Sequence, residues 1–427
     1  MSASVLIAVT HLLGSGHLVR AANLARALAQ GGLSVTLASG GMPLRAMENE
    51  PFAFVQLPAI RTEGTDFRTL LDEGGAPIDP ERKAARIASL EELAARLRPD
   101  AVIVEHFPFG RRQLAAEFLA LIAAVKTVRP GALVLSSVRD VLVTPRADRI
   151  AEAEERVAGM FDAVLVHGDA RFLPLERSWP VGAGLTGKLR YTGYLDAERA
   201  SHLSSPHPEE PQSGVSKDVP DAAGASGSIL RDAISAEMAP QDEGSDGMDE
   251  VIVSGGGSAA ALPLFACAVA AARLDRSGRR WRLLAGRGMA DRDLALLMAE
   301  APGKVVIERA RPDFPTLLAG CAVSISQAGY NTVLDLVAAG RPAIVVPFDA
   351  GNETEQTVRA EAMERAGLAR CFRLSGDFVG DAVALADAVG EAVGSRPAAL
   401  LIDRDGATRS AAIVRELLTD AAGRSRH

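Results

Sequence analysis

Residues 321–359 read CAVSISQAGYNTVLDLVAAGRPAIVVPFDAGNETEQTVR and predict a strand, a helix and a second strand in succession. The apolar and small residues of 322–326 favour a short buried strand, and the apolar residues of 333–337 recur at helical spacing. Gly340 ends that helix before the β-branched strand at 343–346. Such a unit is typical of a parallel sheet, in which ligands bind at the carboxyl ends of the strands.

Two loops of this unit follow strands and therefore meet at one edge of the expected sheet. The first, 327–332, brings amides and hydroxyl groups to the start of a helix, where backbone N–H groups and the helix dipole favour a phosphate. The second, 349–356, carries carboxylates and amides that suit a hydroxyl-rich ligand. Both loops are also compatible with ordinary turn chemistry that binds nothing.

Length and composition predict a cytoplasmic protein of two domains. The chain has 427 residues, 48% of them hydrophobic, which suits two cores of ordinary size. A net charge of −8 argues against nucleic-acid binding by the protein as a whole. The three cysteines lack zinc or disulfide spacing, which favours buried thiols in a reducing compartment. We find no signal peptide and no apolar run long enough to span a bilayer, and peripheral contact with the inner face of the membrane stays open.

The alternation of strands and helices occurs on both sides of one acidic segment. Residues 1–200 and 250–403 each predict a Rossmann-like, doubly wound domain, so the fold class is α/β with two such domains facing a cleft. Between them, 201–249 is rich in acidic residues, Ser, Gly and Pro and has no aromatic residue, which favours a disordered linker or insertion. A partner-binding segment at 228–238 is the alternative. A last helix within 404–427 can pack back on the first domain.

Polar residues also follow the strands expected in the first domain. His17 stands where the first helix starts, and Glu105 ends another strand of the same sheet. A histidine needs an orienting carboxylate to act as a general base, and Glu105 can supply one. His106, Asp140 and His167 follow strands as well, so other pairings stay open, as does a simple helix-start role for His17.

Glycine-bearing turns recur after the expected strands. The loop at 14–16 lacks the full spacing of a dinucleotide-binding fingerprint, which argues against NAD. In the second domain the turns at 254–258, 286–288 and 327–332 can gather amides at one edge of the sheet. With the guanidinium of Arg287, these amides would hold a diphosphate without a metal ion. The Walker sequence of NTPases is absent from the chain.

Several of these motifs together resemble one family. They are GSGH at 14–17, FPFG at 107–110, SVRD at 137–140, SQAGYNT at 326–332 and EQ at 355–356. The chain resembles the GT-B glycosyltransferases, which have two Rossmann domains, and within them glycosyltransferase family 28. That family includes the bacterial enzyme that adds N-acetylglucosamine to lipid I. The likeness is greatest to a bacterial group of predicted glycosyltransferases, and it covers most of the chain outside the acidic segment.

The resemblance implies a nucleotide-sugar donor, usually UDP-linked, on the second domain and an acceptor on the first. From the turns and the resemblance together, the predicted donor-binding residues are Gly255, Gly256, Gly257, Ser258, Arg287, Gln327, Ala328, Gly329, Tyr330, Asn331, Thr332, Asp335, Glu355 and Gln356. Among them, Asp335 would meet the ribose hydroxyls, where the family mostly has Glu, and Glu355 with Gln356 would bind the sugar. The predicted acceptor-side residues are Gly14, Ser15, Gly16, His106 and Asp140, with His17 as the acceptor base and Glu105 as its orienting group.

The predicted activity is therefore the transfer of a hexose-type sugar to an unidentified acceptor, which is a saccharide, a lipid-linked molecule or a small molecule. The resemblance implies no divalent metal, and we expect no cofactor beyond the nucleotide sugar. Two alternatives stay open. A nucleotide-sugar epimerase of the same fold would convert the donor without an acceptor, and a non-catalytic subunit would bind the nucleotide sugar and convert nothing.

Overall fold

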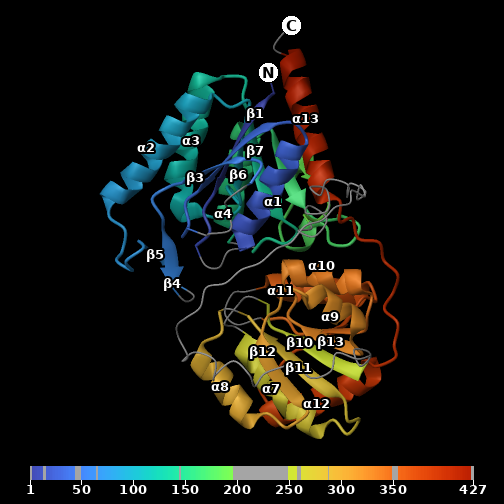
Figure 1. Cartoon of the computed structure of the whole chain (residues 1–427). Helices are drawn as coiled ribbons and strands as arrows, with labels where there is room; N and C mark the ends of the chain where they lie inside the picture. Colours follow the sequence, from blue (N-terminus) through green and yellow to red (C-terminus); the bar gives the residue numbers. More distant parts are fainter. Residues whose placement is uncertain are drawn as a thin grey trace, which may run out of the picture.

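The computed structural model describes residues 2–12, 16–43, 50–63, 66–143, 146–195, 249–256, 261–286, 288–348 and 354–424. Nearly all of the acidic segment 201–249 lies outside this range, as do five of the predicted site residues: Gly14, Ser15, Gly257, Ser258 and Arg287. The described chain forms one domain around a seven-stranded sheet and a second around a six-stranded sheet (Figure 1).

The first sheet has the strand order β3-β2-β1-β6-β7-β8-β9, and every neighbouring pair is parallel. Its strands are β1 (Ser4–Val9), β2 (Ser34–Ser39), β3 (Ala53–Gln56), β6 (Ala101–Glu105), β7 (Leu133–Arg139), β8 (Ala163–His167) and β9 (Leu189–Tyr191). Side chains of β1 alternate between two apolar layers, because Ile7 packs on one face and Leu6 on the other. A sheet that is buried on both faces explains why its strands read as nearly continuous apolar runs.

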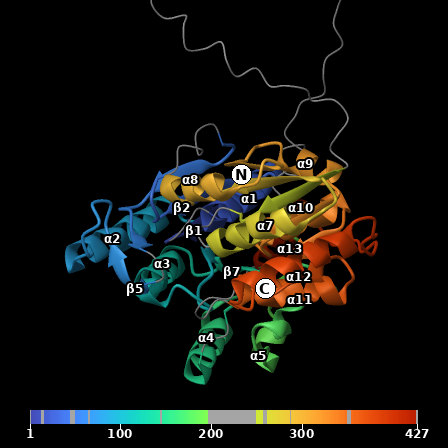
Figure 2. The same ribbon diagram turned by 90° about the horizontal axis from the view of Figure 1, so that it is seen from below.

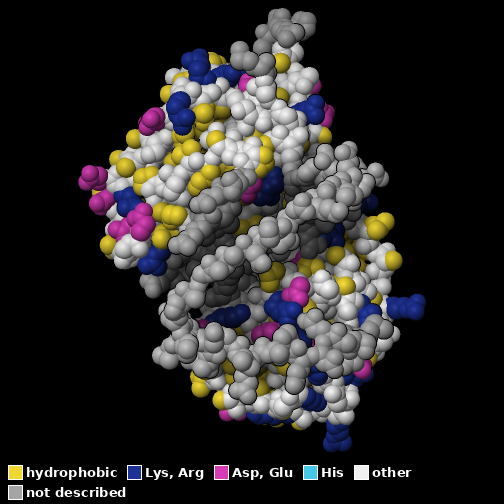
Figure 3. Space-filling model, viewed as in Figure 1, with side chains coloured by type: hydrophobic (Ala, Val, Ile, Leu, Met, Phe, Trp, Pro, Cys, Tyr) yellow, Lys and Arg dark blue, Asp and Glu magenta, His cyan; other side chains and the backbone are white. Residues whose placement is uncertain are grey.

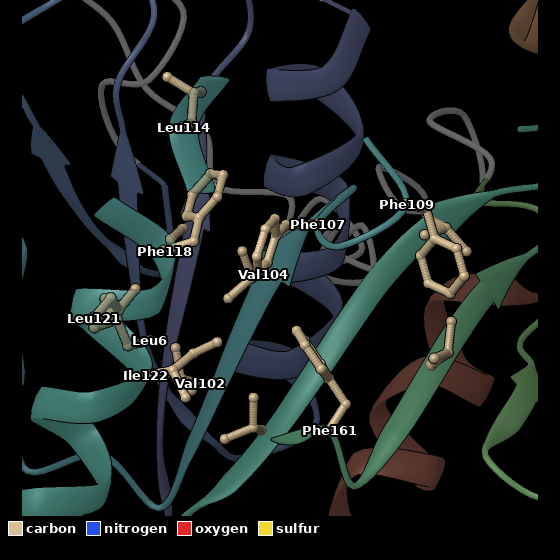
Figure 4. Close-up of a cluster of buried hydrophobic side chains, with 14 of the residues drawn as sticks. Leu6, Val102, Val104, Phe107, Phe109, Leu114, Phe118, Leu121, Ile122 and Phe161 are labelled. Carbon is tan, nitrogen blue, oxygen red and sulfur yellow. The ribbon is translucent and has the colours of Figure 1, made fainter. Parts of the chain in front are cut away.

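Helices cover both faces of this sheet. They are α1 (Gly16–Gln30), α2 (Pro80–Leu97), α3 (Ala115–Val128) and α4 (Ala147–Met160), with short turns η2 (Arg112–Leu114), η3 (Leu175–Arg177) and α5 (Ala183–Thr186). Helices α2, α3 and α4 bury one apolar layer, part of which is drawn in Figure 4. Within it, the rings of Phe107 and Phe118 lie 5.4 Å apart, which fixes the chain just after β6 against α3.

One part of the first domain differs from the prediction. The polar, glycine-bearing residues 62–80 predict a loop, but the structure forms a hairpin of β4 (Arg61–Glu63) and β5 (Asp66–Leu71) there. The hairpin buries Leu70 and Leu71, and two such side chains are too few to produce a clear alternating pattern in the sequence.

The second sheet has the order β12-β11-β10-β13-β14-β15 and is parallel throughout. Its strands are β10 (Glu250–Ser254), β11 (Arg280–Ala285), β12 (Val305–Arg309), β13 (Val323–Ser326), β14 (Ala343–Val345) and β15 (Arg370–Cys371). Its helices are α7 (Leu262–Leu274), α8 (Asp291–Glu300), α9 (Phe314–Gly320), α10 (Tyr330–Ala339), α11 (Glu355–Arg365) and α12 (Phe378–Ala392). Seen from below, α7, α8 and α12 lie on the side away from the first domain (Figure 2), whereas α10 and α11 face it (Figure 1).

The chain crosses between the domains a second time near its end. After α12 it runs back along the molecule, and α13 (Gly406–Arg424) packs against α1 (Figure 1). The crossing is fixed by hydrogen bonds from Tyr194 N to Asp403 O (2.8 Å) and from Asp403 N to Asp169 Oδ2 (3.0 Å). Gly406 follows, where a Cβ atom would stand 2.5 Å from the Tyr194 carbonyl oxygen, so the close approach of the two backbones requires glycine.

Candidate functional site

Each sheet has one point at which the order of its strands reverses along the chain. In the first sheet this point lies between β1 and β6, and in the second it lies between β10 and β13. Ligands of doubly wound folds bind beyond the carboxyl ends of the strands at such points. In this chain His17 and Glu105 lie at the first point, and the turns at 255–256 and 327–329 lie at the second.

The side chains of His17 and Glu105 are hydrogen-bonded to each other. His17 Nδ1 lies 2.8 Å from Glu105 Oε1, and the Glu105 side chain is only 1% exposed. An ionised carboxylate can only accept, so Nδ1 carries the proton and Nε2 keeps its lone pair. Arg20, one turn further along α1, also contacts Glu105 Oε1 and lies 3.2 Å from His17 Nδ1. His17 does stand at the start of α1, yet among the described residues its ring contacts the Glu105 carboxylate of β6 and the Arg20 side chain, and not the helix backbone.

Burial sets the protonation states of this pair. It lowers the pKa of His17 to about 3, although the Glu105 carboxylate opposes that shift. Burial alone would raise the pKa of Glu105, but His17 and Arg20 outweigh it and hold that pKa well below its ordinary value. At neutral pH the pair is therefore a neutral imidazole hydrogen-bonded to a carboxylate, which is the arrangement a general base requires.

His106 stands beside this pair in a strained loop. Its backbone φ is 64°, in the left-handed region, and its ring meets the His17 ring edge-on with centroids 5.5 Å apart. The loop closes tightly, because Gly110 N donates to His106 O at 2.7 Å and a Cβ on Gly110 would stand 2.2 Å from the His106 ring. Burial lowers the pKa of His106 as well, so its ring is neutral. His106 therefore lies against His17 at the candidate site, and its strained backbone is of the kind that is enriched at ligand sites.

The donor-side turns predicted from the sequence lie together at the second point. Gly329 is the N-cap of α10, and no side chain of the described residues caps that helix, so its first backbone N–H groups can meet an anion. Gln327 N donates to Ser254 O at 3.1 Å, which ties this turn to the end of β10. A Cβ on Gly255 would meet Ala261 Cβ at 2.0 Å, so this glycine allows α7 to approach the strand end. Ala328 and Thr332 are buried in this turn, Asn331 is exposed, and Asp335 is half-buried one helical turn further on.

Glu355 and Gln356 are placed differently from the prediction. The polar sequence predicts a loop over 349–356, but both residues belong to the first turn of helix α11. The amide oxygen of Gln356 accepts from Phe348 N at 3.1 Å, which leaves its NH₂ group for a ligand. Glu355 is buried, and its carboxylate contacts Arg139 of the first domain and Arg359 of α11.

A buried polar network joins the two domains beside this site. Arg359 donates from Nε and Nη2 to the carboxylate oxygens of Asp140, each at 3.0 Å, and Tyr194 donates to Asp140 Oδ2 at 3.1 Å. The Tyr330 hydroxyl donates to His167 O and accepts from Leu195 N, both at 3.1 Å. Asp140 and Tyr330, predicted for opposite substrates, thus both lie in the domain contact.

Apolar side chains surround this network. Val141, Phe172, Leu173 and Tyr194 of the first domain share one buried cluster with residues of α10 and α11. The two domains therefore meet through a core that is largely apolar, and the charges inside it must be paired. In Figure 3, side chains of Lys or Arg and of Asp or Glu both appear on each of the two domains among the described residues.

Four charged or polar residues of this region are absent from the sequence predictions, namely Arg20, Arg139, Tyr194 and Arg359. Arg139 lies inside the SVRD motif, and Arg359 follows Glu355 by four residues, which is one helical turn. These two positions in the sequence could have indicated that both arginines belong to the site. Within the described residues no group of three His, Cys, Asp or Glu side chains could hold a metal ion. Among the same residues, none of the helices is long and apolar enough to cross a membrane.

Comparison with solved structures defines the class of the fold. The calicheamicin glycosyltransferase CalG4 matches with a TM-score of 0.56 and 14% identity over 99% of both chains. MurG of Acinetobacter baumannii matches with a TM-score of 0.55 and 15% identity over 98% of this chain and 99% of its own. The chain thus has the GT-B fold of two Rossmann-like domains, as the sequence predicts.

The second domain can be assigned to a particular family. Residues 251–376 match the glycosyltransferase family 28 C-terminal domain, which confirms the resemblance seen in the sequence. Two relatives share the name UDP-N-acetylglucosamine–N-acetylmuramyl-(pentapeptide) pyrophosphoryl-undecaprenol N-acetylglucosamine transferase. The protein of Solidesulfovibrio magneticus is 32% identical over 133 residues, and that of Solibacter usitatus is 41% identical over 61 residues. These matches cover 29% and 14% of this chain, and 36% and 17% of the relatives' own length.

Proposed function

We propose that this chain is a glycosyltransferase that moves a hexose-type sugar from a nucleoside diphosphate sugar, UDP-linked, to a hydroxyl group of an acceptor. The observation that carries the proposal is the hydrogen bond between the half-buried His17 and the buried Glu105, 2.8 Å apart, in a domain that packs against a family 28 C-terminal domain. Transfer requires both features, because the base activates the acceptor and the family 28 domain binds the donor.

The acceptor is activated by His17. Its unprotonated Nε2 takes the proton of the acceptor hydroxyl while that oxygen forms a bond to the anomeric carbon of the sugar. The bond from this carbon to the diphosphate oxygen breaks, and its electron pair leaves with the nucleoside diphosphate. Glu105 keeps His17 Nδ1–H in place and stabilises the imidazolium that forms, because the two groups then carry opposite charges in a buried site.

The donor is bound by the second domain. The first N–H groups of α10 and the turn at 255–256 stabilise the negative charge that develops on the diphosphate. Asp335 binds the ribose hydroxyls, and Gln356 directs its NH₂ group at the sugar, since its amide oxygen is already bonded to Phe348 N. The helix dipoles and amide groups do this without a divalent metal or another cofactor.

The acceptor is a saccharide, a lipid-linked molecule or a small molecule. The name of the curated relatives describes an undecaprenol-linked acceptor, and an acceptor of that kind would bring this protein into peripheral contact with the inner face of the membrane. The first domain, with His17 and His106 at its strand ends, supplies the acceptor side.

Incubation of the full chain with single nucleotide sugars tests the proposal. We expect UDP release, slow with water and faster with an acceptor, and we expect the release to fall in His17→Ala while UDP binding is kept. Isomerisation of the donor without UDP release would identify an epimerase instead. Binding of the donor with no conversion under any acceptor would identify a binding subunit.

A further inference from the structure

Glu355, one of the two residues proposed to bind the donor sugar, is held by guanidinium groups from two sides. Arg359 lies 3.5 Å from its Oε2 atom and is itself fixed by Asp140. Arg139 contacts its Oε1 atom from the carboxyl end of β7 in the first domain. The subsite that contains Glu355 is therefore built from both domains.

The two guanidinium groups differ in their freedom. The Arg359 side chain is 2% exposed and donates to both carboxylate oxygens of Asp140 from its Nε and Nη2 atoms, so it is a fixed support. The Arg139 side chain is 23% exposed, against 4% for Glu355, so it closes the subsite toward solvent. Its Nε atom is buried and has no partner among the described residues, which is a costly state that a ligand hydroxyl would relieve.

The Glu355 carboxylate can serve Arg139 and a sugar together. Each carboxylate oxygen has two lone pairs, so Oε1 can accept from a sugar hydroxyl while it remains in contact with Arg139. Vicinal hydroxyl groups of a hexose then have an acceptor in Glu355 and donors in Arg139 Nε and the Gln356 amide. The nucleoside diphosphate has no hydroxyl group at this position and gains nothing from it.

We propose that Arg139 is a specificity-determining residue that the first domain contributes to the donor-sugar subsite, where it positions Glu355 and donates to a hexose hydroxyl. This inference rests on the proposed function. It implies that the sugar is recognised in full only while the two domains are docked, whereas the nucleotide binds to the second domain alone.

The test compares the binding of UDP-hexose with that of UDP by calorimetry, in wild type and Arg139→Gln. We expect wild type to bind UDP-hexose, chosen as the sugar that it hydrolyses, more tightly than UDP. In Arg139→Gln that preference falls about ten- to a hundredfold, the usual effect of losing a charged hydrogen bond, and UDP affinity stays within about twofold. Arg139→Lys keeps the charge without the planar fork and restores part of the preference.

The matched control is Arg149→Gln, which removes a half-exposed arginine of α4 in the same domain and leaves the preference unchanged. An unchanged preference in Arg139→Gln overturns the inference, and so does an equal loss for UDP and UDP-hexose, which would mean that Arg139 acts through the fold. Wild type that binds UDP without any gain from the sugar overturns the inference but leaves nucleotide binding intact. Wild type that binds neither overturns the proposed function as well.

Discussion

Replacement of Asp140 by Asn tests whether the buried ion pair holds the two domains together. Asp140 is fully buried and accepts two hydrogen bonds from Arg359, each at 3.0 Å, and a third from Tyr194. Loss of one member of such a pair leaves a buried charge without compensation, which typically costs about 3–5 kcal/mol. Asn keeps one acceptor oxygen, and Glu355 lies 3.5 Å from Arg359, so we expect the lower end, about 3 kcal/mol.

The domain contact limits how this cost is expressed. If the domains separate, the Arg359 guanidinium is hydrated again. The domains of the variant should therefore separate when the cost of burying the unpaired Arg359 charge exceeds the free energy that the rest of the domain contact contributes. For domains of this size 1 kcal/mol shifts Tm by about 2–4 °C, so the first transition should fall by about 6–12 °C. Scanning calorimetry measures that shift, and small-angle X-ray scattering measures the radius of gyration, which should increase as the domains separate.

Two controls make the outcome specific. Asp148→Asn removes a carboxylate that is 59% exposed and pairs with surface arginines, and we expect it to change Tm by no more than about 1–2 °C, as surface pairs contribute little. The double variant Asp140→Asn with Arg359→Gln should recover part of the loss, because it also removes the uncompensated charge. Wild-type Tm and radius of gyration in Asp140→Asn would refute the argument.

Three further predictions concern the site and its histidines. His17→Ala should keep UDP affinity and Tm while transfer falls by about two to four orders of magnitude, the usual contribution of a general base, and a folded variant with wild-type turnover would contradict this. Gln356→Ala should lose about 1–3 kcal/mol of transition-state binding for the UDP-sugar and little affinity for UDP, and equal losses would mean that Gln356 merely supports the loop at Phe348. His17 and His167 have pKa values of about 3 in the folded protein and about 6.5 in the unfolded chain. Between pH 3 and pH 6.5 the unfolded chain therefore binds more protons than the folded protein, and the free energy of unfolding falls as the pH drops below about 6.5. At pH 5 each histidine then lowers the free energy of unfolding by up to about 2 kcal/mol. The variant His167→Gln can still form hydrogen bonds with Ser137 and Thr192, and its Tm should fall less between pH 7 and pH 5 than that of wild type.

The fold could be predicted because its signals are local. Runs of β-branched residues, helical spacing and glycine stops define each strand and helix, and repeated β-α units leave a parallel sheet as the simplest architecture. The elements that were missed have weak local signals. Helix α11 begins in the polar sequence around Glu355 and buries few apolar side chains, and the hairpin at 61–71 alternates too briefly to be recognised.

The candidate site could be predicted in part for the same reason. The proximity of His17 to Glu105 follows from the rule that parallel strands end at one edge, so sequence position alone brings them together. The pairs of Asp140 with Arg359 and of Arg139 with Glu355 depend on how two separate domains dock. Docking is determined by surface shape and charge over residues more than two hundred positions apart, and no local pattern encodes it. The functional roles of these residues remain predictions.

The low pKa of His17 is consistent with its proposed role as a base, because the charges around the imidazole would change between the unliganded protein and the transfer step. In the unliganded protein burial disfavours the imidazolium, and Arg20 shares Glu105 Oε1 with His17, which weakens the hold of the carboxylate on a protonated ring. In the proposed mechanism, negative charge develops on the departing diphosphate, and that charge favours the imidazolium in addition to Glu105. In that mechanism the pKa of His17 would therefore rise as the sugar leaves its diphosphate. On this proposal His17 stays unprotonated at neutral pH and takes the proton of the acceptor hydroxyl as the bond to the diphosphate breaks.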